Sequence, residues 1–153
     1  MRVLKNILIG LGVLFLVVLA LFAWVRVSSN QFRKEQAPFV ESFVTDLSKR
    51  WDIADVHGRI ANPFIEQVST PQAQHLLHQF KQLGKLQSVH DLELRGYKSD
   101  NSGRTGIFSF KGVFENGEGL VNVTIVEKSG GARVLGFYLK ATRMRDGGAK
   151  LQT

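Results

Sequence analysis

Hydrophobic and polar positions divide the chain into two regimes. Positions 7–25 begin at Ile7, end at Val25 and form 19 consecutive residues without a charged or polar side chain. A helix of that length spans about 28 Å, close to the roughly 30 Å of a bilayer's hydrocarbon core. After Asn30, apolar and charged residues are mixed as in soluble domains. The pattern predicts an N-terminal transmembrane helix, residues 1–27, that carries one compact domain.

A cleaved signal peptide is the alternative interpretation, because Arg2 and Lys5 form a basic start. The apolar run is longer than a signal peptide needs, and no A-x-A cleavage site follows it. We therefore expect a retained anchor. Basic residues flank the run on both sides, and the short N-terminal tail favours the orientation with the N-terminus inside. In a bacterium this predicts the inner membrane, with the C-terminal domain in the periplasm.

The first part of the domain has helical periodicity. Residues 28–37 are expected to be a juxtamembrane link or a kinked continuation of the membrane helix, because Pro38 favours the first turn of a helix. An amphipathic helix then runs to Trp51. Residues 52–69 predict a short helix broken at 62–63. The next helix begins with Thr70 as N-cap and ends at Gly84, with a predicted buried stripe of Leu76, Leu77, Phe80 and Leu83.

After Gly84 the period changes to the alternation of β-strands. Four strands are predicted over residues 86–97, 104–115, 118–128 and 132–143. Asn116 and Gly117 predict a two-residue type I′ hairpin turn, whose two central residues need positive φ. The fold class is therefore α+β, with helices packed on a curved four-stranded antiparallel sheet over residues 38–143. Residues 144–153 have no periodicity, which predicts a disordered basic tail.

The order of these elements resembles a known superfamily. The long first helix, the helix that ends at Leu83 and Gly84, and the last strand, which reads Val-Leu-Gly-Phe-Tyr-Leu over residues 134–139, are similar to the cystatin-like or nuclear-transport-factor-like α+β domains. The resemblance covers residues 32–143 and implies a curved sheet wrapped around the first helix. That superfamily includes enzymes, ligand-binding cones and assembly modules, so the fold alone implies no single function.

Composition limits the chemistry. The net charge of +7 falls to +4 without the three basic residues that flank the span, which gives no reason to expect nucleic acid as a partner. The chain contains no cysteine. No nucleophile elbow, Walker loop or zincin helix is present, so we expect no enzyme, no cofactor and no metal.

Three pairs of titratable residues are the remaining candidates for metal or acid–base chemistry. They are His75 with His78, Asp91 with Glu93, and Glu115 with Glu118. Metal binding needs further ligands at matching spacing, and acid–base catalysis needs carboxylates in different buried surroundings. The sequence favours solvated side chains for all three pairs.

Aromatic and basic residues supply two candidate binding regions. An apolar cone or a filled core is predicted from Phe43, Trp51, Phe80, Phe108, Phe110 and Tyr138. A cluster of basic residues near the C-terminus is a candidate contact for lipid or an acidic partner, with Lys140, Arg143 and Arg145 as its members.

The sequence thus leads to two functional hypotheses. The first is an accessory or scaffold subunit of a bacterial envelope complex, with other inner-membrane or periplasmic proteins as partners. The alternative is a periplasmic binding module that holds a lipid or other apolar ligand in a cone between helix and sheet.

Overall fold

A computed structural model describes residues 1–144 of the chain. It contains two compact units, Met1–Lys34 and Glu35–Thr153. The predicted basic tail covers residues 144–153. Its first residue, Met144, belongs to the last strand. Residues 145–153 lie outside the described residues.

The first unit consists of helix α1, which extends over Arg2–Ser48 and so continues into the second unit. Every side chain from Ile7 to Val25 is exposed, and this helix is long and apolar enough to cross a membrane. Residues 28–37, where a link or a continued helix was expected, are helical. Pro38 lies inside α1 and does not start a new helix.

In the second unit, short helices follow the end of α1. They are η1 (Ile53–Arg59), α2 (Asn62–Val68), α3 (Pro71–Phe80) and η2 (Lys81–Leu83). The predicted start of α3 is confirmed, because the Thr70 hydroxyl accepts a hydrogen bond from the Ala73 N–H and Pro71 occupies the first turn. The break predicted at 62–63 exists, but it lies earlier, where the chain is extended at Ile60 and Ala61. Asn62 begins α2, and Pro63 lies in its first turn.

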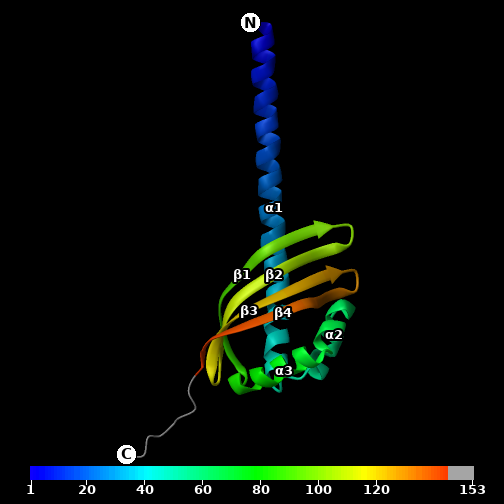
Figure 1. Ribbon diagram of the computed structural model, residues 1–153. Helices are drawn as coiled ribbons and strands as arrows, with labels where there is room; N and C mark the ends of the chain where they lie inside the picture. The colour runs from blue at the N-terminus through cyan, green and yellow to red at the C-terminus, as the bar shows by residue number, and fades with distance from the viewer. Residues whose placement is uncertain (145–153) are drawn as a thin grey trace, which may run out of the picture. The chain divides into compact units, whose positions relative to one another are not determined.

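The helix-first, sheet-later order is confirmed by four antiparallel strands. They are β1 (Leu86–Asp100), β2 (Gly103–Phe114), β3 (Gly117–Lys128) and β4 (Gly131–Met144). The strands lie in chain order, with β2 and β3 in the centre (Figure 1). At the β4 edge the Ala61 N–H donates to the Val134 carbonyl at 2.8 Å, so the segment before α2 partly covers this edge. The chain is an α+β protein with an open sheet.

The hairpin between β2 and β3 exists, but its predicted turn was wrong. The turn residues are Glu115 and Asn116, and neither they nor Gly117 has positive φ. Gly117 already pairs with Phe114 as the first residue of β3. A Cβ atom there would lie 2.5 Å from the carbonyl oxygen of Arg143, so close packing and not turn geometry requires this glycine.

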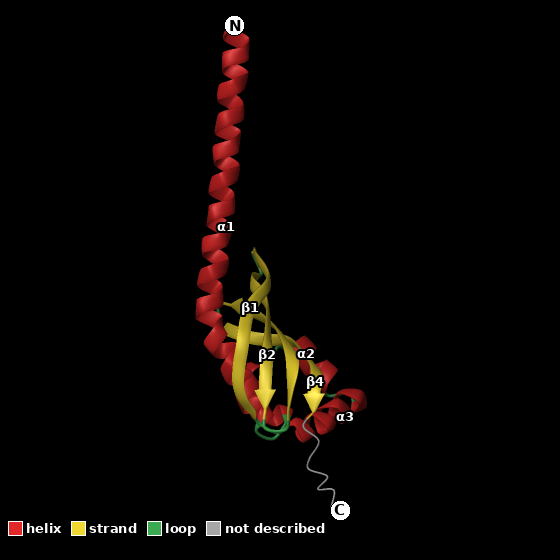
Figure 2. Cartoon of the chain, turned by 90° about the vertical axis from the view of Figure 1, so that its left-hand side faces the viewer, coloured by secondary structure: helices red, strands yellow, loops and turns green. Residues whose placement is uncertain are grey.

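The hydrophobic core lies between the sheet and residues 35–48 of α1. Side chains from β2 and β3 alternate, so that every second residue points toward the helices. Figure 2 shows the strands from the side, with α2 and α3 near each other at one end of the sheet. Fully buried residues come from both layers and include Val40, Phe43, Val44, Leu47, Phe108, Phe110, Val121, Val123 and Ile125.

Candidate binding pocket and charged cleft

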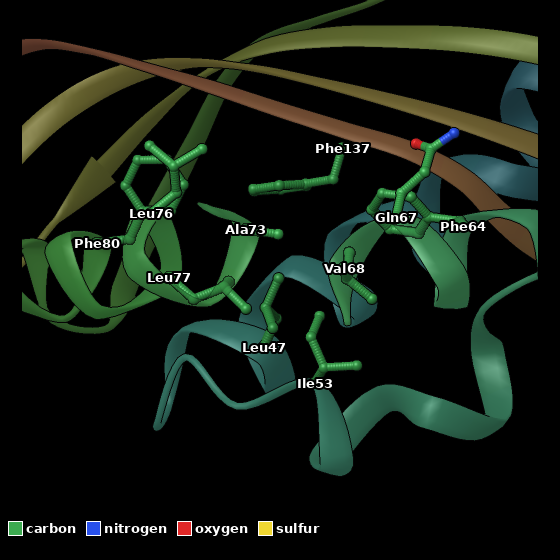
Figure 3. A pocket seen from close by; sticks show the side chains of 10 residues that line it. All are labelled: Leu47, Ile53, Phe64, Gln67, Val68, Ala73, Leu76, Leu77, Phe80 and Phe137. Atoms are coloured by element: carbon green, nitrogen blue, oxygen red, sulfur yellow. The ribbon is translucent and has the colours of Figure 1, made fainter. Parts of the chain in front are cut away.

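An open apolar pocket lies where α2, α3 and β4 meet the end of α1 (Figure 3). Its volume is about 190 Å³. Nine of its ten lining side chains are apolar, and Gln67, whose amide points away from the cavity centre, is the exception. The apolar walls include Leu47, Ile53, Phe64, Val68, Leu77 and Phe137. The pocket is therefore suited to binding an uncharged apolar group.

Helix α3 leaves this pocket open because of two of its side chains. Ala73 is too small to fill the space that it faces. Leu76, which the sequence placed in the buried stripe, is 49% exposed, whereas Leu77 beside it is buried. An exposed leucine at the edge of an apolar pocket extends the apolar surface that a binding partner would cover.

The predicted cone between helix and sheet is filled. Phe43 and Phe108 are 0% exposed and Phe110 is 1% exposed. The sequence left a cone and a filled core as alternatives for these residues, and their burial supports the core. Of the six aromatic candidates only Phe80 lines the pocket.

Trp51 connects the core with the pocket. Its indole Nε1–H donates to the Gly84 carbonyl at 3.0 Å, and its ring lies 5.5 Å from that of Phe80 and 5.8 Å from that of Phe114. The residue lies in the turn after α1 and has φ of +53°, in the left-handed region that L-amino acids rarely adopt. The hydrogen bond and the two ring contacts offset this backbone strain.

Tyr138 does not belong to the predicted cone or core. It is 57% exposed and pairs with Asn122, while its neighbours Phe137 and Leu139 pair with the buried Val123 and Val121. Because side chains alternate along a strand, Tyr138 projects from the opposite face of the sheet.

The predicted basic cluster is only partly described. Lys140 and Arg143 are exposed on β4, where they pair with Leu120 and Glu118 of β3. Arg145 lies outside the described residues. The two described members share one end of an edge strand, and their contact with lipid or an acidic partner stays a prediction.

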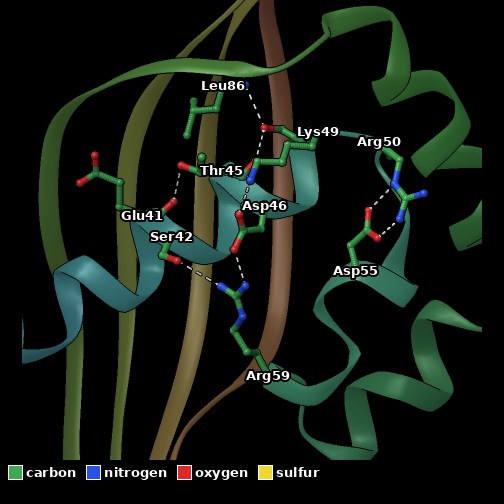
Figure 4. A network of polar contacts seen from close by, with 10 residues as sticks. Glu41, Ser42, Thr45, Asp46, Lys49, Arg50, Asp55, Arg59 and Leu86 are labelled. Carbon is green, nitrogen blue, oxygen red and sulfur yellow. Dashed lines mark hydrogen bonds and ion pairs between the residues drawn. The ribbon is translucent and has the colours of Figure 1, made fainter.

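A charged cleft near the C-terminal end of α1 is lined by Asp46, Lys49, Arg50, Asp55 and Lys85. Figure 4 shows two ion pairs at this cleft that reach η1, Asp46 with Arg59 and Asp55 with Arg50; Lys49 also pairs with Asp46, at 2.9 Å. Both pairs join α1 or the turn after it to η1. They therefore hold η1, which carries the pocket residue Ile53, against the end of α1.

These ion pairs shift the acidity of the two carboxyl groups. Hydrogen bonds from Arg59 and then Lys49 hold the pKa of Asp46 below its ordinary value of 3.8. The hydrogen bond from Arg50 likewise lowers the pKa of Asp55. Both carboxylates stay ionised and paired at neutral pH, so the cleft contains no carboxylic acid able to donate a proton.

The candidate titratable pairs form no catalytic arrangement among residues 1–144. His75 contacts the side chain of Gln79 at 3.1 Å, and no group of three or more potential metal ligands occurs in this part of the chain. Glu93 pairs with Arg95 at 3.1 Å, and Glu118 with Lys111 at 3.3 Å. Both ion pairs lie at the protein surface, where such pairs contribute little to stability.

The sequence missed the pocket because its walls come from five separate segments. Leu76 gave no local signal, because it lies between His75 and Leu77 and its spacing predicted a buried residue. A scan against protein families finds no match for this chain, and searches of curated proteins and of solved structures find none either. The resemblance to the cystatin-like superfamily stays a prediction.

Proposed function

We propose that this chain is a single-pass accessory or scaffold subunit of a bacterial envelope complex, which acts by binding other proteins. The observation that carries the proposal is the uncharged stretch from Ile7 to Val25, none of whose side chains is buried in the protein. Exposing such a surface to water costs free energy, roughly 25 cal/mol for each Å² of apolar area. A bilayer removes this penalty.

In this proposal the chain stays in the inner membrane with its N-terminus in the cytoplasm and its domain in the periplasm. The short tail with Arg2 and Lys5 supports this orientation. Trp24, close to the end of the apolar stretch, fits the interfacial position that indole rings prefer.

Protein binding suits the domain better than catalysis does. Its described acidic residues are exposed or paired with cations, and the apolar pocket beside α3 offers no nucleophile, acid or base. A membrane anchor also raises the concentration of the domain near other membrane proteins, so that a modest interface suffices for association. Small interfaces of this kind are common in transient complexes.

Purification from native membranes tests this function. The tagged full-length protein is extracted in a mild detergent, and every protein recovered with it is quantified. We expect a defined set of membrane or periplasmic proteins in stoichiometric amount. An unrelated single-span protein with the same tag is the control. Recovery of the protein alone, or of the same set with the control, would contradict the proposal.

A binding module for an apolar ligand is the second candidate function, and the pocket beside α3 is the observation that favours it. The filled core between Phe43 and Phe108 counts against a large internal cone. In the same purification, one lipid or other apolar molecule per protein, without partner proteins, would favour this function over the first.

A further inference from the structure

The volume of the pocket beside α3 limits what it can hold. Pockets for drug-sized ligands have volumes of about 300–1,000 Å³. At about 190 Å³ this pocket is smaller, and closer to engineered apolar cavities of about 150 Å³, which accept a molecule of the size of benzene. One leucine, isoleucine or phenylalanine side chain fits this space, whereas a whole lipid does not.

The mouth of the pocket favours a protein surface as the occupant. Leu76 is half exposed at this edge and would be covered by a chain that lies across α3. An apolar anchor in a pocket, surrounded by contacts that exclude water, is the usual arrangement of a protein-binding hot spot.

Charge around α3 indicates the kind of segment that binds. No Asp or Glu occurs in α3 or η2, and Lys81 at the start of η2 is exposed. The exposed side chains of these two helices are therefore neutral or basic. A partner segment with acidic residues beside its apolar anchor would complement them, and a basic segment would not.

We propose that the pocket between α2, α3 and β4 receives one apolar side chain from an acidic segment of a partner protein. This inference rests on the proposed function as a protein-binding subunit. It adds the docking surface and the chemistry of the partner: an aliphatic or aromatic anchor with aspartate or glutamate within a few residues of it.

Site-specific photocrosslinking tests the proposal in native membranes. A benzophenone-bearing amino acid replaces Leu76 in the full-length protein, and the same amino acid at Tyr138, on the other face of the sheet, is the control. We expect Leu76 to give protein adducts in several-fold higher yield than Tyr138. Mass spectrometry of the adduct is expected to show an apolar residue flanked by acidic ones.

Two substitutions sharpen this test. Ala73→Leu fills the pocket from its wall, so we expect it to reduce the Leu76 adduct about tenfold, the effect of losing one good hot-spot contact. Ala141→Leu, on the exposed end of β4, is the matched control and leaves the adduct unchanged. Lys81→Glu reverses a charge near α3 and should lower the adduct yield several-fold.

Each other outcome overturns the inference in a recognisable way. Adducts with lipid alone at Leu76 would show that the pocket faces acyl chains. Equal yields of protein adducts at Leu76 and Tyr138, or an adduct that survives Ala73→Leu, would show that the pocket is not the docking site. Neither result would contradict the proposed function. No protein adduct at either position, together with no partner in the purification, would contradict both.

Discussion

The domain has two aromatic regions with opposite characters. Between the sheet and α1, Phe43, Phe108 and Phe110 are closely packed and exclude water. Beside α3, Phe80 and Phe137 line an open pocket that Leu76 borders. The two regions have similar composition, so composition alone does not distinguish core from binding surface. What differs is whether small or outward-pointing residues on the adjoining helix leave space unfilled.

The largest expected effect separates the two regions directly. Phe108→Ala removes a fully buried ring and should lower the free energy of unfolding by about 3–5 kcal/mol. Leu76→Ala should lower it by less than about 1 kcal/mol, as expected for a surface position. Thermal or urea unfolding of the full-length protein in mild detergent measures both. Similar losses for the two variants would show that the pocket is part of the core.

A smaller effect is expected at Trp51, where core and pocket meet. Trp51→Phe keeps an aromatic ring but removes the hydrogen bond to the Gly84 carbonyl, which should lower the free energy of unfolding by about 1–3 kcal/mol. Trp24→Phe makes the same change in the apolar stretch and is the control. If both variants unfold at the same temperature as the wild type, the hydrogen bond does not stabilise the domain.

The smallest effect concerns Asp46, whose ion pair with Arg59 holds η1 and its pocket residue Ile53 in place. Because folding lowers the pKa of Asp46, its stabilising contribution is complete above pH 3.8 and is lost as the pH falls through the lower folded value. Asp46→Asn should therefore be less stable than the wild type at pH 7, and the difference should shrink toward pH 3.

Unfolding curves measured across this pH range check the prediction. Asp91→Asn is the control, because it removes a carboxylate that pairs with no cation in the described structure, and asparagine tolerates its positive φ. A difference between Asp46→Asn and the wild type that does not change with pH would contradict the proposed role of the ion pair.

Most of the fold follows from local patterns in the sequence. Alternation predicted all four strands, and Thr70 with Pro71 predicted the start of α3. Local patterns failed where tertiary contacts decide. Gly117 is required by the nearby Arg143 backbone and not by a turn, and Leu76 is exposed because the adjoining walls do not reach it.

The candidate site was less predictable than the fold. The pocket combines Leu47, Phe64, Leu77 and Phe137, which are distant in the sequence and meet only when α2 packs against both β4 and α3. Periodicity in the sequence does not predict contacts between such distant residues. The apolar stretch at the N-terminus, by contrast, depends only on consecutive residues and was therefore evident from the sequence.

The most direct test of the account compares two changes to the membrane anchor in the quantitative purification. Replacing residues 7–25 with a leucine–alanine span of equal length should leave partner recovery within about twofold, because the span serves as a tether while the domain recognises the partner. Removing the span should reduce recovery at least about tenfold, through the loss of effective concentration. Partners that disappear when only the span sequence is replaced would contradict recognition by the domain.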